Sequence, residues 1–370
     1  MTTLHTLFDD YGQSPWIDNI RRDWLNDGTL ARLVSQGVRG VTSNPSIFAK
    51  AFATSSAYDE HLADLRGANP EEVFEALAVG DVRDACDVLG ALHEGSRDEF
   101  RSGRRRYCDG YVSLEVSPRL ARDSDATIEA ARRLAASVGR ANVMIKIPAT
   151  KEGLPAVTQA LGSGINVNVT LIFSIERYDE VITAWLDGLE LARKNGHDLS
   201  SIGSVASFFV SRVDAAVDAV LPEGDERRGT TANAQVAAAY RLYRERVASP
   251  RVTSLLEQGA QVQRPLWAST STKDPSYYDL LYVDYIVGDE TVNTMPDATL
   301  AGVLDHGNFA SSLLASSDAT AAAAARLGEL PSEVSLRAVT DKLEIDGVAA
   351  FVGSYEDLLA TVSSKIESQV

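Results

Sequence analysis

Lys146 lies in the middle of an otherwise apolar run, NVMIKIP (142–148), followed by ATKEG. Strand alternation sends Met144 and Lys146 to the face opposite Ile145 and Ile147. In a parallel strand covered on both faces the amine is shielded from water, and burial favours its uncharged form. A free amine can attack a carbonyl and form a Schiff base. The alternatives are a solvated lysine on an edge strand and a lysine paired with a structural carboxylate.

Two further strand candidates carry polar side chains at alternate positions, so these side chains share one parity and face the same side of the strand. In GYVSLEV (110–116), Ser113 and Glu115 alternate with apolar residues. In INVNVTLIF (165–173), the polar parity is Asn166, Asn168 and Thr170, and the outward parity is Ile165, Val167, Val169 and Leu171. With Lys146 these side chains would share one lumen. An antiparallel sheet with one solvated face gives the same alternation, but the repeated strand–helix order favours parallel pairing.

Short apolar or alternating runs of this kind recur eight times, separated by stretches of helical period. They are centred near Trp16, Val41, Leu114, Ile145, Val169, Ala206, Trp267 and Val292. This order predicts an α/β fold, a single (β/α)8 TIM-type barrel with extra helices, and leaves a doubly wound open sheet as the alternative. We expect one domain over residues 1–370, with strands roughly within 14–296 and helical additions at 46–106, 212–260 and 303–370.

The composition narrows the class of partner. The 370 residues are 45% hydrophobic and 24% charged, as in ordinary globular proteins, and the formal net charge of −17 argues against nucleic acid. A local basic cluster can still hold a small anion. The first residues carry acidic side chains and no run of 18 apolar residues occurs, so we expect neither a signal peptide nor a membrane span. Cys86 and Cys108 form no CxxC pair, which favours a reducing cytoplasm.

Cofactor motifs give no positive signal. The five histidines are scattered without HxH or HExxH spacing, and no strand is followed by GxGxxG or GxxxxGK[ST]. We therefore expect no metal and no organic cofactor, and chemistry carried by side chains alone.

Four segments together resemble a known family. They are GVTSNPSIF (40–48), SLEV (113–116), the lysine strand with its trailing PATKEG, and INVNVTLIFS (165–174). In this order and spacing they resemble transaldolases, the class I Schiff-base enzymes of the pentose phosphate pathway, and the chain is similar to the longer form found in actinobacteria and cyanobacteria. The resemblance extends over about residues 14–310.

The resemblance implies catalytic roles for four residues. Lys146 matches the Schiff-base lysine on the fourth barrel strand. Asp18, at the end of the first strand, matches the acid/base carboxylate that takes a hydroxyl proton as the carbon–carbon bond breaks. Glu115 and Thr170 match the pair that holds the water used when the carbinolamine forms and collapses.

It also implies where the substrate binds. Asn44, Asn168 and Ser207 match groups that hydrogen-bond the dihydroxyacetone part. Arg212, just past the sixth strand, and Ser269 match phosphate-binding residues. A guanidinium clamps a phosphate through two hydrogen bonds, and binding energy at that remote group orients the sugar.

Several of these residues have a plainer interpretation. Asp18 could cap the following helix, and Asn44 could be a turn former. Glu115 could be a structural partner that keeps the lysine protonated. Arg212 could pair with Asp214 on a helix surface.

The sequence departs from the family pattern near Ser269. Shorter transaldolases have an arginine two positions after the phosphate serine, where this chain has Ser271. We predict that Ser271 or Lys273 replaces it, because a basic group is needed to balance the dianion. Fructose 6-phosphate aldolases have a tyrosine where this chain has Phe209 and a glutamine where it has Glu115, so both positions favour a transaldolase.

The expected function is transfer of a dihydroxyacetone unit from sedoheptulose 7-phosphate to glyceraldehyde 3-phosphate. A fructose 6-phosphate aldolase and a non-catalytic barrel that binds sugar phosphates are the alternatives. We expect sugar-phosphate substrates, no nucleic-acid or membrane partner, a cytoplasmic location and a monomer or homodimer.

Overall fold

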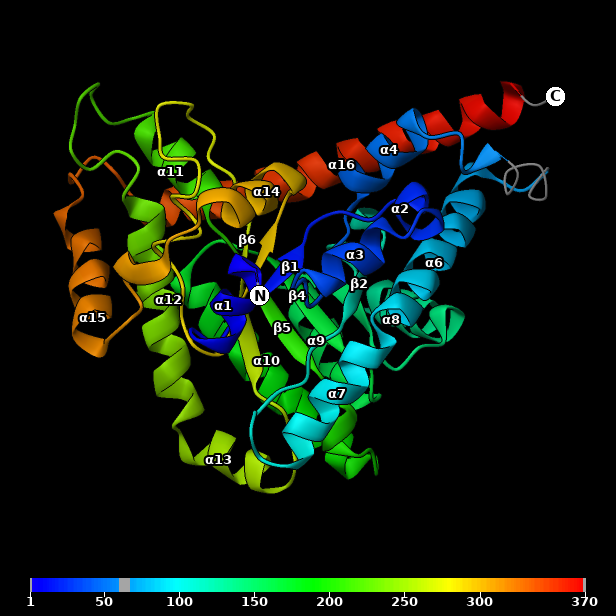
Figure 1. The fold of residues 1–370 in the computed structure, drawn as a ribbon, viewed down its shortest axis with the longest axis horizontal. Coiled ribbons are helices and arrows are strands. Elements are labelled where there is room, and N and C mark those ends of the chain that lie inside the picture. The colour runs from blue at the N-terminus through cyan, green and yellow to red at the C-terminus, as the bar shows by residue number, and fades with distance from the viewer. Residues whose placement is uncertain (1, 60–66, 369–370) are drawn as a thin grey trace.

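The computed structural model describes residues 2–59 and 67–368. At its centre is a seven-stranded parallel sheet in the order β1-β7-β6-β5-β4-β3-β2. Val41 forms parallel bridges with Ile17 and with Val112, and these join the two ends of the sheet into a barrel. Figure 1 shows the helices that surround it. The predicted TIM-type barrel is confirmed. The strands are β1 (Gln13–Ile17), β2 (Val112–Glu115), β3 (Val143–Pro148), β4 (Val167–Ile172), β5 (Ser204–Phe209), β6 (Gln263–Ala268) and β7 (Thr291–Met295).

The segment near Val41 differs from its prediction, since it forms isolated bridges rather than a strand. Gly40 lies against the indole of Trp16, where an added Cβ would come within 2.3 Å of a ring carbon. Shortly afterwards Asn44 caps a helix whose first residue is Pro45, which ends the extended segment. The Val41 amide still donates to the Tyr111 carbonyl at 2.9 Å, so the barrel closes there.

The outward parity of the strands packs under helices and forms the main core. Ile145, Ile147 and Val169 are fully buried there, as expected for parallel strands covered on both faces. The α-helices are α1 (Thr3–Asp9), α2 (Arg22–Asn26), α3 (Thr29–Ser35), α4 (Pro45–Thr54), α6 (Pro70–Val88), α7 (Gly90–Arg101), α8 (Ser124–Val138), α9 (Gly153–Gly162), α10 (Ile175–Lys194), α11 (Ser211–Asp218), α12 (Thr231–Val247), α13 (Pro250–Glu257), α14 (Asp297–His306), α15 (Ser317–Ala325) and α16 (Leu336–Ser368). Short 3-10 turns cover Pro118–Leu120, Leu199–Ser201, Phe309–Ser311 and Arg326–Glu329.

Strand β4 breaks its alternation near its end. We predicted Leu171 on the outer face with Val167 and Val169, and this is wrong, because Leu171 packs in a second cluster of buried side chains. We call this set the lumen cluster; it consists of Trp16, Cys108, Tyr111, Met144, Leu171, Phe173, Val205, Phe209, Leu266, Ala268, Val292 and Phe351. The pairing of β4 with β5 shifts register between Val169 and Ile172, and Leu171 has a φ of 61°. An extra residue in a strand reverses the parity beyond it. Ile172 therefore packs in the outer core in place of Leu171.

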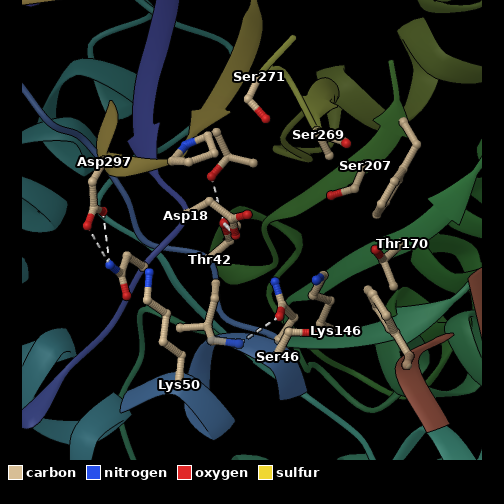
Figure 2. A pocket seen from close by; sticks show the side chains of 18 of the residues that line it. Asp18, Thr42, Ser46, Lys50, Lys146, Thr170, Ser207, Ser269, Ser271 and Asp297 are labelled. Carbon is tan, nitrogen blue, oxygen red and sulfur yellow. Dashed lines mark hydrogen bonds between the residues drawn. The ribbon is translucent and has the colours of Figure 1, made fainter. Parts of the chain in front are cut away.

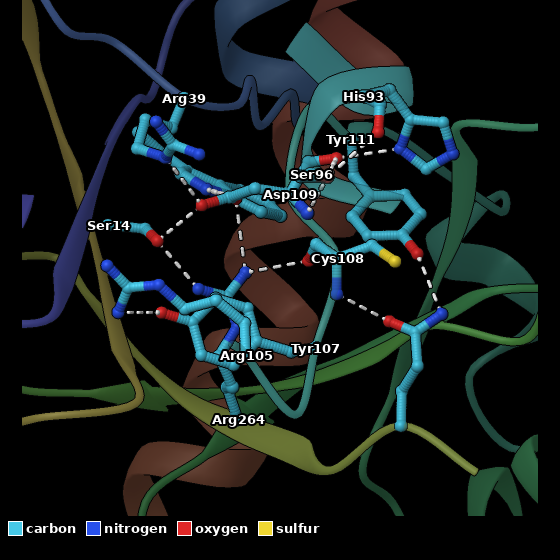
Figure 3. A network of polar contacts seen from close by, with 12 residues as sticks. Ser14, Arg39, His93, Ser96, Arg105, Tyr107, Cys108, Asp109, Tyr111 and Arg264 are labelled. Atoms are coloured by element: carbon cyan, nitrogen blue, oxygen red, sulfur yellow. Dashed lines mark hydrogen bonds and ion pairs between the residues drawn. The ribbon is translucent and has the colours of Figure 1, made fainter. Parts of the chain in front are cut away.

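The amino-terminal end of the lumen is filled by a buried ionic network (Figure 3). Arg264 of β6 is 1% exposed, and its guanidinium lies 3.1 Å from Asp109 Oδ1 and 3.9 Å from the centre of the Tyr107 ring. Asp109 also accepts hydrogen bonds from Arg39 Nε and Trp16 Nε1, both at 2.9 Å. Burial opposes ionisation of Asp109, but the two arginines hold its pKa below the usual value. Ionic side chains thus close this end of the barrel.

The C-terminal helix α16, 33 residues long, crosses the opposite end of the barrel and runs beside α4 (Figure 1). Arg119 donates to both carboxylate oxygens of Glu356, at 2.9 and 2.8 Å, and the Tyr355 hydroxyl donates to Glu71 at 2.8 Å. These contacts fix the helix over the carboxyl ends of the strands. None of the helices in the described ranges combines the length and apolar character that crossing a membrane requires.

Candidate active site

A pocket of about 520 Å³ lies at the carboxyl ends of the strands, beneath α16 (Figure 2). This is where the βα loops of a TIM barrel meet. Ten of the twelve predicted site residues line it, namely Asp18, Asn44, Lys146, Thr170, Ser207, Phe209, Arg212, Ser269, Ser271 and Lys273. The other two, Glu115 and Asn168, are buried neighbours that hydrogen-bond residues of the same lumen.

Lys146 of β3 is 4% exposed. Its Nζ donates to the Ser43 carbonyl and to Glu115 Oε2, each at 3.1 Å. The register of β2 and β3 places Glu115 directly opposite Lys146, so adjacent parallel strands bring the pair together. Burial raises the pKa of Glu115, although the lysine beside it acts in the opposite direction. The interpretation of Glu115 as a partner of Lys146 is thus correct in its geometry.

Two oxygens near this pair are buried without a hydrogen-bond partner among the described residues. They are Glu115 Oε1 and Thr170 Oγ1. Asn168, by contrast, is held on both sides, since its Nδ2 donates to Ser113 Oγ at 3.0 Å and its Oδ1 accepts from Ser207 Oγ at 2.7 Å. The two free oxygens can bind a hydroxyl or a water, and Asn168 has a fixed orientation.

Asp18 follows β1 directly, and its backbone amide donates to the Met295 carbonyl at 2.8 Å. The Thr42 hydroxyl donates to Asp18 Oδ1 at 2.6 Å and also lies 2.6 Å from the Thr294 hydroxyl. Burial raises the pKa of Asp18, and Lys146 and Thr42 offset part of this effect. The capping interpretation is wrong, because α2 begins at Arg22 and Asp18 is turned to Thr42.

Arg212 and Lys273 supply positive charge to one part of the pocket. Lys273 Nζ donates to Ser271 Oγ at 2.9 Å, and the Ser269 hydroxyl lies 3.0 Å from that of Ser211. Burial, together with the neighbouring Arg212, lowers the pKa of Lys273. An anion that bound here would relieve this repulsion.

The predicted alternative for Arg212, a surface ion pair with Asp214, is wrong. Asp214 instead accepts hydrogen bonds from the Ala232 amide at 2.7 Å and the Tyr282 hydroxyl at 2.8 Å. The Arg212 guanidinium lies 5.4 Å from the centre of the Phe209 ring, and it forms no salt bridge within residues 2–59 and 67–368. Its charge is therefore available to a ligand.

Asn44 and Phe209 each stabilise the fold and also line the pocket. The Asn44 Oδ1 accepts from the Ile47 amide at 3.0 Å and caps α4, which leaves the amide nitrogen for other contacts. Phe209 packs 5.1 Å from Phe173, centre to centre, in the lumen cluster. Both residues also line the pocket.

The pocket residues that sequence reasoning missed include Thr42, Thr294 and Phe351. Thr42 lies inside the GVTSNPSIF segment directly after Val41, so strand parity offered a signal for it. Thr294 alternates in the same way in the last strand, with Val292 on its own parity. Phe351 comes from α16, and no local pattern connects it with the barrel.

The side chains that could bind a metal ion do not cluster in the described residues. Over the part of the chain that the structure describes, no three His, Cys, Asp or Glu residues gather as a metal site requires. His61 lies outside the described residues. Cys86 and Cys108 are both buried as free thiols.

The fold and the pocket define an α/β-barrel protein with a buried amine beside two carboxylic acids. Residues 15–362 match the family model described as transaldolase/fructose-6-phosphate aldolase. The chain is 49% identical over 367 residues to a protein named Transaldolase from Acidothermus cellulolyticus, covering 96% of this chain and 95% of that one. It is 49% identical to the Transaldolase from Thermobifida fusca, with 96% of each chain covered. It is 41% identical to Transaldolase 2 from Nostoc, covering 97% of this chain and 96% of that one.

The chain belongs to the transaldolase/fructose-6-phosphate aldolase family. The predicted similarity to the longer form from actinobacteria and cyanobacteria is confirmed by these relatives.

Proposed function

We propose that this protein is a transaldolase that moves a dihydroxyacetone unit from sedoheptulose 7-phosphate to glyceraldehyde 3-phosphate through an imine on Lys146. The names of relatives that match it over nearly the whole chain support the activity. The observation that carries the mechanism is the buried Lys146 amine, 3.1 Å from Glu115.

The hydrogen bonds of Lys146 suit a nucleophile. A neutral amine has two hydrogens, and Nζ has two acceptors, Ser43 O and Glu115 Oε2. The lone pair then remains for the ketone carbonyl of the sugar. Burial raises the pKa of Glu115 and so favours the protonated, uncharged form of this carboxyl.

We assign the proton transfers of imine formation to Glu115 and Thr170. Attack of Nζ on the ketone gives a carbinolamine, and loss of its hydroxyl as water gives the iminium ion. Both transfers need a group that gives and takes protons beside the reacting carbon. The unpartnered Glu115 Oε1 and Thr170 Oγ1 support this assignment.

Asp18 acts as the base in the cleavage step. It takes the proton of the sugar's C4 hydroxyl, and the electron pair of the C3–C4 bond moves toward the iminium. The C4 fragment leaves as an aldehyde, and the three-carbon fragment remains on Lys146 as an enamine. Burial strengthens an ionised Asp18 as a base, because it raises the pKa of the carboxyl. The reverse sequence joins the enamine to the incoming aldehyde, and Asp18 returns the proton to its oxygen.

Arg212 and Lys273 bind the phosphate, with Ser269 and Ser271 as hydrogen-bond donors. Their charges have no carboxylate partner among the residues described, and a phosphate dianion provides one. Asn44, Asn168 and Ser207 bind the dihydroxyacetone part, and Phe209 forms an apolar wall.

The test is a coupled assay for erythrose 4-phosphate formed from sedoheptulose 7-phosphate and glyceraldehyde 3-phosphate. The wild-type protein should produce it, and Lys146→Ala should lose at least about 1000-fold in kcat. Release of dihydroxyacetone from fructose 6-phosphate without an acceptor, at a rate equal to transfer, would identify an aldolase instead. If both products are absent, the proposal fails.

A further inference from the structure

The C-terminal helix contributes an aromatic side chain to the pocket. Phe351 of α16 is 5% exposed, lines the pocket and packs in the lumen cluster that includes Phe173 and Phe209. The centre of its ring lies 5.6 Å from Lys146 Nζ. No other helix of the described chain that follows β7 supplies a residue of this cluster.

The packing of α16 fixes the position of that ring. Gly347, one turn earlier on the same helix face, lies so close to the barrel that an added Cβ would be 3.2 Å from Leu171 Cδ2 and 3.3 Å from Phe173 Cε2. On the other side of Phe351, Ser354 Oγ accepts a hydrogen bond from Ser46 Oγ at 2.8 Å. The ring is thus held between two contacts of the helix with the barrel mouth.

The proposed reaction has a branch point at which shielding from water matters. After cleavage, the enamine on Lys146 can add its C3 to an aldehyde, which is transfer. It can instead take a proton at C3 and become an iminium ion. One water then adds to the C2 carbon, and the carbinolamine breaks down to free dihydroxyacetone and the lysine amine.

We propose that Phe351 is a positioning residue that shields the Lys146 imine from water and so favours transfer over release of dihydroxyacetone. This inference rests on the proposed transaldolase function. The ring offers water no hydrogen bond, whereas Glu115 Oε1 and Thr170 Oγ1 are unpartnered oxygens of the same lumen that can hold one. The ring therefore reduces the space beside the imine in which a water molecule can be held by hydrogen bonds.

The test compares two rates, dihydroxyacetone release from fructose 6-phosphate without acceptor and transfer to an aldehyde. Phe351→Ala should raise the ratio of release to transfer about tenfold, which corresponds to about 1.4 kcal/mol in relative barrier height. Phe351→Leu keeps an apolar side chain and should restore most of the wild-type ratio. The matched control is Leu358→Ala, since Leu358 is fully buried on the same helix but does not line the pocket.

The variants separate shielding from loosening of the helix. Leu358→Ala should lower thermal stability and leave the ratio unchanged. If Phe351→Ala leaves the ratio unchanged, or if Leu358→Ala raises it equally, the role of the Phe351 ring is overturned. Failure of the proposed function is recognised separately, because the wild-type protein would then show no transfer at all.

Discussion

The Thr42 hydroxyl donates a 2.6 Å hydrogen bond to Oδ1 of Asp18, the buried carboxyl that we assign as the base. This bond stabilises the ionised form, so Thr42→Val should raise the pKa of Asp18 further above its usual value. The acidic limb of the plot of kcat against pH should then shift to higher pH by about one unit. The pH–rate profile of the variant measures the shift.

Thr42→Ser is the control for this prediction, because serine keeps the hydroxyl and loses only a methyl group. Its acid limb should stay at the wild-type pH. An acid limb that does not move in Thr42→Val would mean that Asp18 does not govern the pH dependence.

Lys273→Ala tests the phosphate site. Loss of one charge-assisted hydrogen bond should raise KM for sugar phosphates about 10- to 100-fold, with a smaller change in kcat. Lys50→Ala is a matched control, since Lys50 lines the same pocket but lies on the other side of Asp18 from Ser269 and Ser271 in Figure 2. An unchanged KM in Lys273→Ala would refute the assignment.

Asp214 should make the protein less stable as the pH rises. Burial raises its pKa to about 6, so the folded state binds this proton more tightly than the unfolded state, where an aspartate titrates near 3.9. The stabilisation is complete below the unfolded pKa and is lost as the pH rises through about 6. Its size is on the order of 3 kcal/mol.

Asp214→Asn removes this titration. Urea unfolding midpoints at pH 4.5 and pH 7 should therefore differ less in the variant than in the wild-type protein. Asp81, whose pKa burial also raises to about 6, remains in the variant and preserves part of the dependence. Identical pH dependence in the two proteins would contradict the prediction.

The sequence was sufficient to predict the barrel and the gathering of the pocket residues. Lys146, Glu115 and Asn168 lie in adjacent parallel strands, and residues paired across such strands on one parity must share a face. Asp18 directly follows β1, and Arg212 lies in the first turn of α11, just after β5, which brings both to the same rim. These relationships depend on strand order and alternation, which the sequence contains.

What the sequence did not predict depends on packing between distant segments. The parity of Leu171 changes at a register shift that apolar residues on both sides conceal. Arg264 is the second residue of β6 and is buried with its charge balanced because Asp109 and Tyr107 meet it inside the barrel. Phe351 belongs to a helix whose place over the pocket is set by contacts such as Arg119 with Glu356. Local sequence patterns do not indicate which distant residues these side chains contact.

The central claim is that the buried Lys146 amine forms an imine with a ketose. Incubation with fructose 6-phosphate and cyanoborohydride, followed by peptide mass spectrometry, tests it most directly. We predict one reduced adduct, on the peptide that contains Lys146, and none in Lys146→Ala. An unmodified wild-type protein, or an adduct on a different lysine, would contradict the account.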